Sequence, residues 1–318
     1  MSTITGLHHV TVISGDAQQN LEFYAGVLGM RLVKRSVNQD DPGTYHLFYA
    51  DGEGHPGAEL TFFPWAKMPA GRKGVGLTSE VGLAVPAGTL DWWTERVAQH
   101  GVAGAQRAVR FGEQVLTFSD PHGVSLALIE TADPRDFTPW ADSPVPESHQ
   151  IRGLHAVRLE ESTLVPTEHF LTSAMGFEKI GEEDGWHRYG VRGGGSGRVV
   201  DVRSNPGAPR GTWGVGSVHH VAFRVPDDEA ELAAREQIVA TGRQPTEVID
   251  RFWFKSVYFK EPGGVLFEIA TDGPGFGVDE DLATLGESLV LPPFLEPHRA
   301  EIERRLPTLT MPALGAAS

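Results

Sequence analysis

The chain of 318 residues contains four mutually similar segments, and this repetition constrains its fold more than any other feature. The first and third segments open with GLHHVTV and GLHAVRL, and the second and fourth open with SEVGLAV and SVHHVAF. Each opening is followed by a helix-like stretch and then by alternating apolar and polar residues between Gly-rich turns. The pattern predicts an α+β fold built from four βαβββ modules.

A Pro-rich stretch, TPWADSPVPESHQ, separates the second module from the third and indicates a linker. The order along the chain predicts an N-terminal domain of modules one and two at residues 1–137. Modules three and four are expected to form a C-terminal domain at residues 151–272. The repeat then ends, and residues 273–318 are predicted to form an extended C-terminal tail with a short helix near its end.

The composition restricts both the chemistry and the partners of the protein. The chain has no cysteine, which excludes disulfides and a cysteine nucleophile and leaves histidine and carboxylate as candidate metal donors. Its net charge of -15 argues against nucleic-acid binding, which needs a basic surface. No apolar run approaches the ~18 residues of a membrane helix, and the start MSTITGLHHV lacks a secretory leader. We therefore expect a cytoplasmic protein without a membrane partner, and the sequence leaves homo-oligomerisation open.

Doubled histidines occur at matching places in modules one and four, as His8 and His9 and as His219 and His220. Glu268, in PGGVLFEIA, lies near the end of module four. A single histidine on a strand is more often structural than a ligand. Two doubled pairs at matching positions, together with a carboxylate, favour a metal site instead.

Strand geometry and the repeat together select one histidine of each pair. Neighbouring strand residues point to opposite faces, so only one of each pair is expected to line the site. At the positions of His9, His220 and Glu268, modules two and three carry residues that do not repeat the set, namely Ala156, Glu80 and Ala127. One metal site per chain is therefore expected, built across the two domains. Two imidazoles and one carboxylate suit a divalent metal with vacant positions, above all non-haem Fe(II).

The whole chain resembles the vicinal oxygen chelate superfamily, which includes glyoxalases, bleomycin resistance proteins and extradiol dioxygenases. The residues that carry the resemblance are HHVT near the start, VHHVAF in module four and GGVLFE near its end. The segments YHLFYADGEGHPGAELTFFPW, DRFWFKSVYFKEPGGVLFEIATD and LPPFLEPHRAEI look like those of ring-cleaving, hydroquinone-type dioxygenases. The resemblance implies paired modules whose curved mixed sheets form open cups around Fe(II), with His9, His220 and Glu268 as ligands.

The same resemblance implies residues that surround the metal. Tyr258, Arg251 and His219 match catalytic positions, Arg251 to hold an anionic oxygen of the substrate and Tyr258 to donate a hydrogen bond or a proton. The substrate-binding positions are expected to be His8, Thr11 and Arg251, with Phe252 and Trp253 as either the apolar wall for the ring or part of the sheet core. Thr11 shares the strand face of His9, whereas strand alternation turns His8 and His219 away from the metal unless the strands bend.

The function implied by this resemblance is an Fe(II)-dependent, extradiol-type dioxygenase that opens a hydroquinone or catechol ring with O2. Its partners would be a small aromatic diol and O2, and Mn(II) is an alternative metal because the same ligands accept both. Two alternatives stay open. A metal-dependent isomerase or lyase of the glyoxalase kind would need a further ligand, for which Glu59 is the candidate. A non-catalytic small-molecule-binding protein of the same superfamily is the other.

Two further features are interpreted as structural. The run RGGGSGR at residues 192–198 lacks the GK[ST] ending of a phosphate-binding loop and is expected to be a hairpin loop. His46 and His187 occupy matching positions in modules one and three, in YHLFY and WHRYG. This match indicates a shared architectural role.

Overall fold

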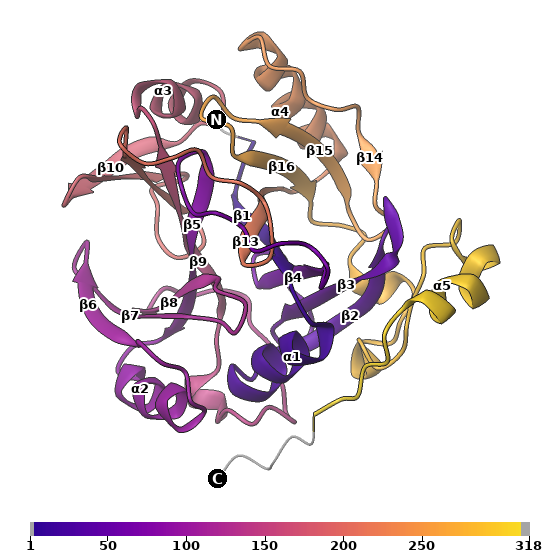
Figure 1. Cartoon of the computed structure of the whole chain (residues 1–318). Helices are drawn as coiled ribbons and strands as arrows, with labels where there is room; N and C mark the ends of the chain where they lie inside the picture. Colours follow the sequence, from indigo (N-terminus) through magenta and orange to yellow (C-terminus); the bar gives the residue numbers. More distant parts are fainter. Residues whose placement is uncertain (1–2, 313–318) are drawn as a thin grey trace.

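The computed structural model describes residues 3–312, which form two eight-stranded mixed sheets with helices around their outer sides (Figure 1). The first sheet has the strand order β14 (Ile249–Asp250), β15 (Lys255–Lys260), β16 (Leu266–Thr271), β13 (Ser217–Val225), β1 (Gly6–Ser14), β4 (Glu59–Pro64), β3 (Asp41–Ala50) and β2 (Arg31–Asn38). The second has the order β10 (Glu178–Glu183), β11 (Trp186–Gly190), β12 (Val199–Ser204), β9 (Gly153–Glu161), β5 (Leu77–Pro86), β8 (Ser125–Thr131), β7 (Glu113–Ser119) and β6 (Gln106–Arg110). The predicted α+β fold of paired modules in curved mixed sheets is confirmed.

The sheets do not group the modules in the order in which the chain supplies them. Strand β1 of module one pairs with β13 of module four, and β5 of module two pairs with β9 of module three, both antiparallel. The first sheet therefore joins the two ends of the repeat, and the expected halves 1–137 and 151–272 do not correspond to the two sheets. The division of the chain into residues 1–137 and 151–272, on either side of the Pro-rich linker, stays a prediction. The first strand of each module has a free backbone edge, and here the first strand of another module completes it.

Each module contributes one helical segment where the repeat predicted it. These are α1 (Ala17–Leu21), which continues as the π-helical η1 (Glu22–Val27), and then α2 (Leu90–Gln99), α3 (Val165–Ser173) and α4 (Asp228–Ala240). The side chains of Asp16 and Asp227 accept hydrogen bonds from Gln19 N and Ala230 N, so they cap α1 and α4. Leu21, Trp93, Phe170 and Ile238 bury the inner faces of the four helical segments in one core.

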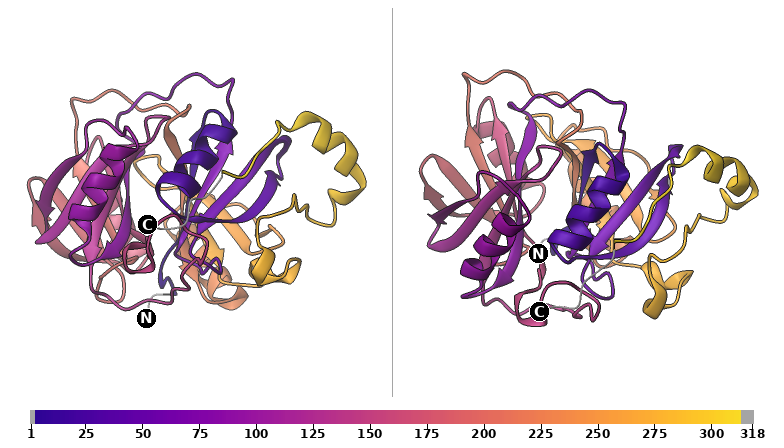
Figure 2. Two further views of the ribbon diagram at one scale, coloured as in Figure 1. Left: turned by 90° about the horizontal axis from the view of Figure 1, so that it is seen from below. Right: turned by 60° about the horizontal axis from the view of Figure 1, so that its bottom comes forward.

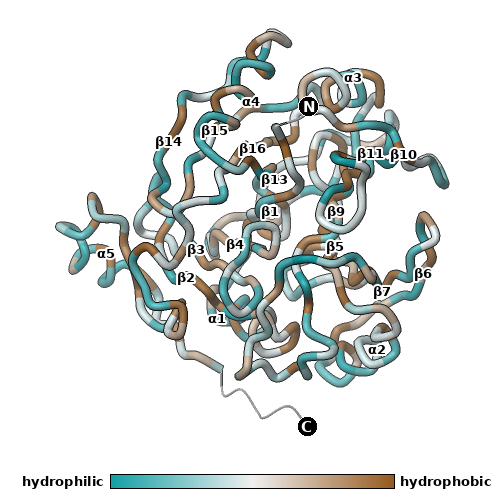
Figure 3. Tube along the Cα trace, turned by 180° about the vertical axis from the view of Figure 1, so that it is seen from behind, coloured by the Kyte–Doolittle hydropathy of each residue, from teal (hydrophilic) through white to brown (hydrophobic). Residues whose placement is uncertain are grey.

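The core joins both sheets. Strand residues such as Val10 and Val221 from the first sheet and Val81 and Val157 from the second are fully buried in the same cluster. Figure 3 shows apolar stretches recurring along the strands of both sheets. Because the outward face of each central strand supplies this core, the opposite face of each sheet remains available to line a cup.

The C-terminal tail lies against the edge of the first sheet, as Figure 2 shows in yellow beside β2 and β3. It contains the short 3₁₀ turns η3 (Phe276–Val278), η4 (Leu282–Thr284) and η5 (Glu296–His298) and the helix α5 (Arg299–Arg305).

The linker between the second and third modules holds one 3₁₀ turn, η2 (Glu147–His149). The glycine-rich run at 192–198 connects β11 to β12, which confirms the predicted hairpin loop. Within residues 3–312, no helix has the length and apolar character that a membrane span needs.

A buried carboxyl pair gives the stability of the fold a dependence on pH. Burial and the nearby charge of Glu261 raise the pKa of Glu161 to about 8. The folded state therefore keeps a proton that the unfolded chain releases near pH 4.5, and stability falls as pH rises between these values. We expect Glu161→Gln to remove this decline and to raise the free energy of unfolding at pH 8 by about 1 kcal/mol or more.

Urea titrations at pH 5, 6.5 and 8 measure this effect. The matched control is Glu236→Gln on the exposed side of α4, which should keep the pH profile of the unmodified chain. An unchanged decline in the Glu161→Gln variant would show that another group is responsible.

Candidate metal centre

His9, His220 and Glu268 meet on the concave side of the first sheet. His9 and Glu268 both stand level with Ala222 of the middle strand, and His220 lies two residues before Ala222. His220 Nε2 is 2.9 Å from Glu268 Oε2, His9 Nε2 is 3.3 Å from the same oxygen, and the two Nε2 atoms are 3.2 Å apart. One sheet therefore brings together His9 from module one and His220 and Glu268 from module four.

This spacing fits a single cation. The three donor atoms lie close enough to contact one ion, and the three side chains are buried. Metal–nitrogen and metal–oxygen bonds of about 2.1 Å at right angles would place neighbouring donors about 3 Å apart. Two imidazoles and a carboxylate on one side of an ion leave further coordination positions vacant, which is the donor set of non-haem Fe(II) oxygenases.

Two β-bulges decide where the doubled histidines point. The pairing between β1 and β13 is irregular at two places. His8 has no partner on β13 between Leu7 and His9, and His219 has none on β1 between Val218 and His220. A bulge sets two residues against one on the partner strand and breaks the alternation of faces. The Nδ1 atoms of His8 and His9 are consequently 2.9 Å apart, and those of His219 and His220 are 2.8 Å apart. The strands thus bend at both pairs, which is the condition under which His8 and His219 were expected to approach the site, although neither lines the cavity beside it.

His8 fixes the tautomer of His9. The carbonyl oxygen of Thr271 lies 3.1 Å from His8 Nε2 and can only accept, so this nitrogen carries the proton. Burial, followed by the neighbouring His9, lowers the pKa of His8 to about 3, so its ring is neutral and its Nδ1 is an acceptor. His9 must then donate through Nδ1, which leaves its Nε2 lone pair facing Glu268 and His220. Such outer contacts orient metal-binding histidines in general.

Ser256 orients the carboxylate of Glu268, as His8 orients His9. Its hydroxyl donates to Glu268 Oε1 at 2.5 Å, whereas Oε2 accepts no well-aligned hydrogen bond from any residue between 3 and 312. Burial opposes the ionisation of Glu268, whereas His9 and His220 lower the pKa of its carboxyl well below the usual range where they face it with a proton or a positive charge, a place that a bound cation would take. The site thus presents one carboxylate oxygen, oriented by Ser256, beside the Nε2 atoms of His9 and His220. No pattern in the sequence pointed to Ser256.

We expect Ser256→Ala to weaken metal binding by roughly 10- to 100-fold, because the carboxylate loses the donor that orients it. Competition against a chelator of known affinity measures the effect. Ser36→Ala is the matched control, since Ser36 is fully buried in the same sheet and its hydroxyl has no hydrogen-bond partner among the described residues. Equal metal affinities in the two variants would contradict the role given to Ser256.

A small cavity of about 40 Å³ adjoins the triad. Besides His9 and His220, its lining consists of Asn38, Gln39, Asp40, His46, Phe48, Phe63, Arg251, Trp253, Phe254 and Tyr258. His46 therefore belongs to the site, contrary to its interpretation as architecture. Its Nε2 lies 2.9 Å from Thr61 Oγ1, which lies 2.7 Å from Thr11 Oγ1. The matching His187 in module three concealed this role, because a shared residue type suggested a shared structural use.

Tyr258 and Arg251 stand beside the triad. Tyr258 pairs with Glu268 across β15 and β16, and its ring lies 5.6 Å from that of His220. Burial raises the pKa of Tyr258, so the phenol stays protonated. The guanidinium of Arg251 lies 5.4 Å from the centre of the Tyr258 ring and forms an ion pair of 3.0 Å with Asp40.

The aromatic residues of the same loop divide between the cavity and the sheet. Trp253 is buried, lines the cavity and donates through Nε1 to Asp279 at 3.1 Å. Phe252 packs against Trp253 with ring centres 5.7 Å apart and lies outside the cavity lining. Phe254, which the sequence did not single out, contacts the rings of both His8 and His9 at 5.3 Å.

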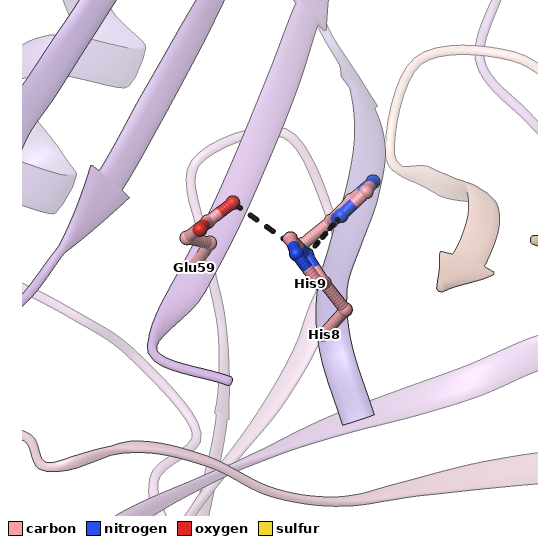
Figure 4. Close-up of side chains that lie close together, drawn as sticks. All are labelled: His8, His9 and Glu59. Atoms are coloured by element: carbon pink, nitrogen blue, oxygen red, sulfur yellow. Dashed lines mark hydrogen bonds and ion pairs between the residues drawn. The ribbon is translucent and has the colours of Figure 1, made fainter. Parts of the chain in front are cut away.

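Glu59 of β4 points toward His8 and His9 (Figure 4). Its Oε2 is 4.0 Å from His8 Nδ1, and it groups with His8 and His9 rather than with His220 and Glu268. Burial, with Asp51 and Glu268 nearby, raises the pKa of Glu59 well above its usual value, so the carboxyl is neutral. The candidate fourth ligand therefore does not join the triad.

Comparison with known proteins agrees with this geometry. The profile of the Glyoxalase/Bleomycin resistance protein/Dioxygenase superfamily matches residues 6–128 and 165–269. The chain is 42% identical over 301 residues to “Putative ring-cleaving dioxygenase MhqO” of Bacillus subtilis, with 95% of each chain covered. It is 34% identical over 311 residues to chlorohydroquinone/hydroquinone 1,2-dioxygenase of Sphingobium indicum, covering 95% of this chain and 96% of that protein.

Solved structures agree on the fold. A Bacillus subtilis crystal structure titled “putative dioxygenase” superposes with a TM-score of 0.93 at 41% identity, covering 98% of this chain and 99% of that one. Glyoxalase I from Zea mays superposes with a TM-score of 0.62 at 16% identity, covering 84% of this chain and 92% of that one, which shows the shared fold alone. The chain therefore belongs to the glyoxalase/bleomycin resistance protein/dioxygenase superfamily.

Proposed function

We propose that this protein is a ring-cleaving dioxygenase that opens a hydroquinone-type ring with O2 at an Fe(II) ion held by His9, His220 and Glu268. The observation that carries the proposal is the buried triad of two imidazole nitrogens and one free carboxylate oxygen, all within 3.3 Å of one another. The names of the relatives at 34% and 42% identity support the same reaction class. Mn(II) is the alternative metal, since the same donors accept it.

When bound, the metal would supply adjacent positions for a phenolate and O2 and would mediate electron transfer between them. The protein contributes orientation and protons. Arg251 is proposed to hold an anionic oxygen of the substrate, because its guanidinium lines the cavity and currently pairs with the exposed carboxylate of Asp40. Tyr258 is proposed to donate its phenolic proton, which burial retains on the oxygen.

His219 is proposed to transfer a proton between the site and the surface. Its Nδ1 contacts His220, and its ring stacks on Trp213 with centres 4.6 Å apart. Trp213 is 39% exposed, so the His219 ring lies between a proposed metal ligand and the solvent-facing side of the protein. His8 contributes by orienting His9, and Thr11 by supporting His46 through Thr61.

Substrate entry requires the cavity to widen. Its volume of about 40 Å³ is far below the roughly 300–1,000 Å³ of ordinary small-molecule sites. The turn between β2 and β3 forms part of the wall, and its Gln39 donates to Arg251 O at 2.9 Å while Asp40 pairs with the Arg251 guanidinium. An anionic substrate oxygen would compete with Asp40 for Arg251 and so release this turn.

Anaerobic reconstitution with Fe(II) or Mn(II), followed by oxygen-electrode assays, tests the proposal. Hydroquinone, chlorohydroquinone and catechol are expected to cause oxygen uptake, with a ring-opened product that has gained both oxygen atoms of ¹⁸O2. Turnover of the hemithioacetal substrate of glyoxalase I without uptake would indicate the isomerase instead. Binding of the diols to the metal-loaded protein without any turnover would indicate a sequestration protein.

A further inference from the structure

The second sheet has a cup of its own, and it contains a cavity of about 520 Å³. The start of β5, the strands β9, β11 and β12, and the turn before β8 form most of its wall, and residues 70–74 and 215–218 complete it. This volume falls within the range of about 300–1,000 Å³ that is typical of small-molecule sites. The cavity is therefore large enough for an organic molecule rather than a single inorganic ion.

Three residues of the cavity lining carry buried polar atoms that lack a hydrogen-bond partner within the described chain. Thr78 Oγ1, both ring nitrogens of His122 and Arg203 Nε are buried and have no hydrogen-bond partner among residues 3–312. The side chain of His122 is only 7% exposed. Most buried polar side-chain atoms in folded proteins do have a partner. Small rotations of these three side chains would bring their donors to a ligand that accepts hydrogen bonds.

The cavity is also positively charged within an acidic protein. Arg72, Lys73, Arg158 and Arg203 line it, against the carboxylates of Glu80 and Glu160, although the whole chain has a net charge of -15. A local excess of cations in a cleft attracts anions and raises their local concentration. The electrostatics therefore select an anionic ligand.

The two strand arginines are held in fixed positions. The guanidinium groups of Arg158 and Arg203 lie 3.9 Å and 4.5 Å from the ring centre of Trp186. Arg158 also contacts Asp201 at 3.4 Å, and Arg203 pairs with Glu160. Prearranged guanidinium groups suit a carboxylate, because their planar N–H groups match its two oxygens.

We propose that the second cup binds a small organic anion through its carboxylate group. The strand register shows different chemistry at equivalent positions of the repeat. Glu80 lies opposite Arg158 in the second sheet, whereas His220 lies opposite Thr11 in the first. Ala156 and Ala127 stand at the positions of the other two metal donors and lie outside the lining of this cavity, so the anion would bind beside the place of the missing metal site rather than in it.

Isothermal titration calorimetry of the metal-loaded chain with succinate, benzoate and inorganic phosphate at constant ionic strength tests this. We expect a carboxylate to bind once per chain and more tightly than phosphate. Arg203→Lys keeps the cation and its pairing with Glu160 but removes the buried Nε donor. It should therefore raise the Kd of the carboxylate by about tenfold or more. Thr78→Val should raise this Kd severalfold, and Arg304→Lys on the exposed side of α5 should leave it unchanged.

Glu268→Gln separates this site from the metal centre. Carboxylate binding that persists in Glu268→Gln and weakens in Arg203→Lys supports the proposal. Binding that is lost in Glu268→Gln but unchanged in Arg203→Lys places the anion at the metal and overturns it. No heat with either carboxylate, or a tighter Kd for phosphate, overturns it as well. If Arg203→Lys does not fold, Thr78→Val carries the same comparison.

Discussion

Replacing Glu268 by glutamine is expected to abolish oxygen uptake and to remove stoichiometric metal binding. Glutamine keeps the size of the side chain but loses the charge that neutralises the cation between His9 and His220. The loss should exceed the roughly 100-fold upper end seen for residues that only orient metal ligands. Metal analysis after gel filtration and oxygen-electrode assays measure both effects on one preparation.

Glu113→Gln is the matched control, because Glu113 also pairs with a histidine inside a cup. Its carboxylate contacts His155 Nε2 at 2.9 Å and Arg188 Nη1 at 2.6 Å in the second sheet. This variant should retain its metal and its oxygen uptake. Full metal content in Glu268→Gln, or loss of metal in Glu113→Gln, would contradict the proposed metal centre.

Replacing Lys34 by methionine is expected to lower the free energy of unfolding by about 3 kcal/mol or more. The ammonium group is fully buried, lies 2.8 Å from Asp279 Oδ1, pairs with Glu280 and donates to Phe276 O at 3.2 Å. Removing one partner of a buried ion pair leaves the remaining charges uncompensated, which typically costs about 3–5 kcal/mol. Urea denaturation followed by circular dichroism measures the change.

The same substitution should release the tail. Lys34 is a main anchor of the segment that follows β16, and Asp279 also accepts from Trp253 in the wall of the metal cavity. Limited proteolysis should therefore cut the tail faster in Lys34→Met. Lys255→Met is the control, since Lys255 pairs with Asp228 on the surface, where ion pairs contribute little. Equal stability losses in the two variants would show that burial of the Lys34 ion pair is not the cause.

Part of the site was accessible from the sequence because repetition made the differences between modules visible. His9, His220 and Glu268 stood out only because other residue types replace them at equivalent positions, and the structure does bring their donor atoms together. Their role as ligands stays a proposal until a metal is bound. His46 escaped this reasoning because module three carries a histidine at the same place. Ser256 escaped it because its partner lies on the neighbouring strand, and a serine by itself carries no signal.

The sequence by itself determined the four βαβββ modules, the restriction to nitrogen and oxygen donors, and which modules carry the candidate ligands. These properties follow from residue identity and from backbone periods that operate over a few residues. Only the tertiary structure decided that module one pairs with module four, and that bulges turn His8 and His219 toward the rings of His9 and His220. Both depend on how two strand edges about 210 residues apart align, and hydrogen bonding between edges leaves no pattern in either strand alone.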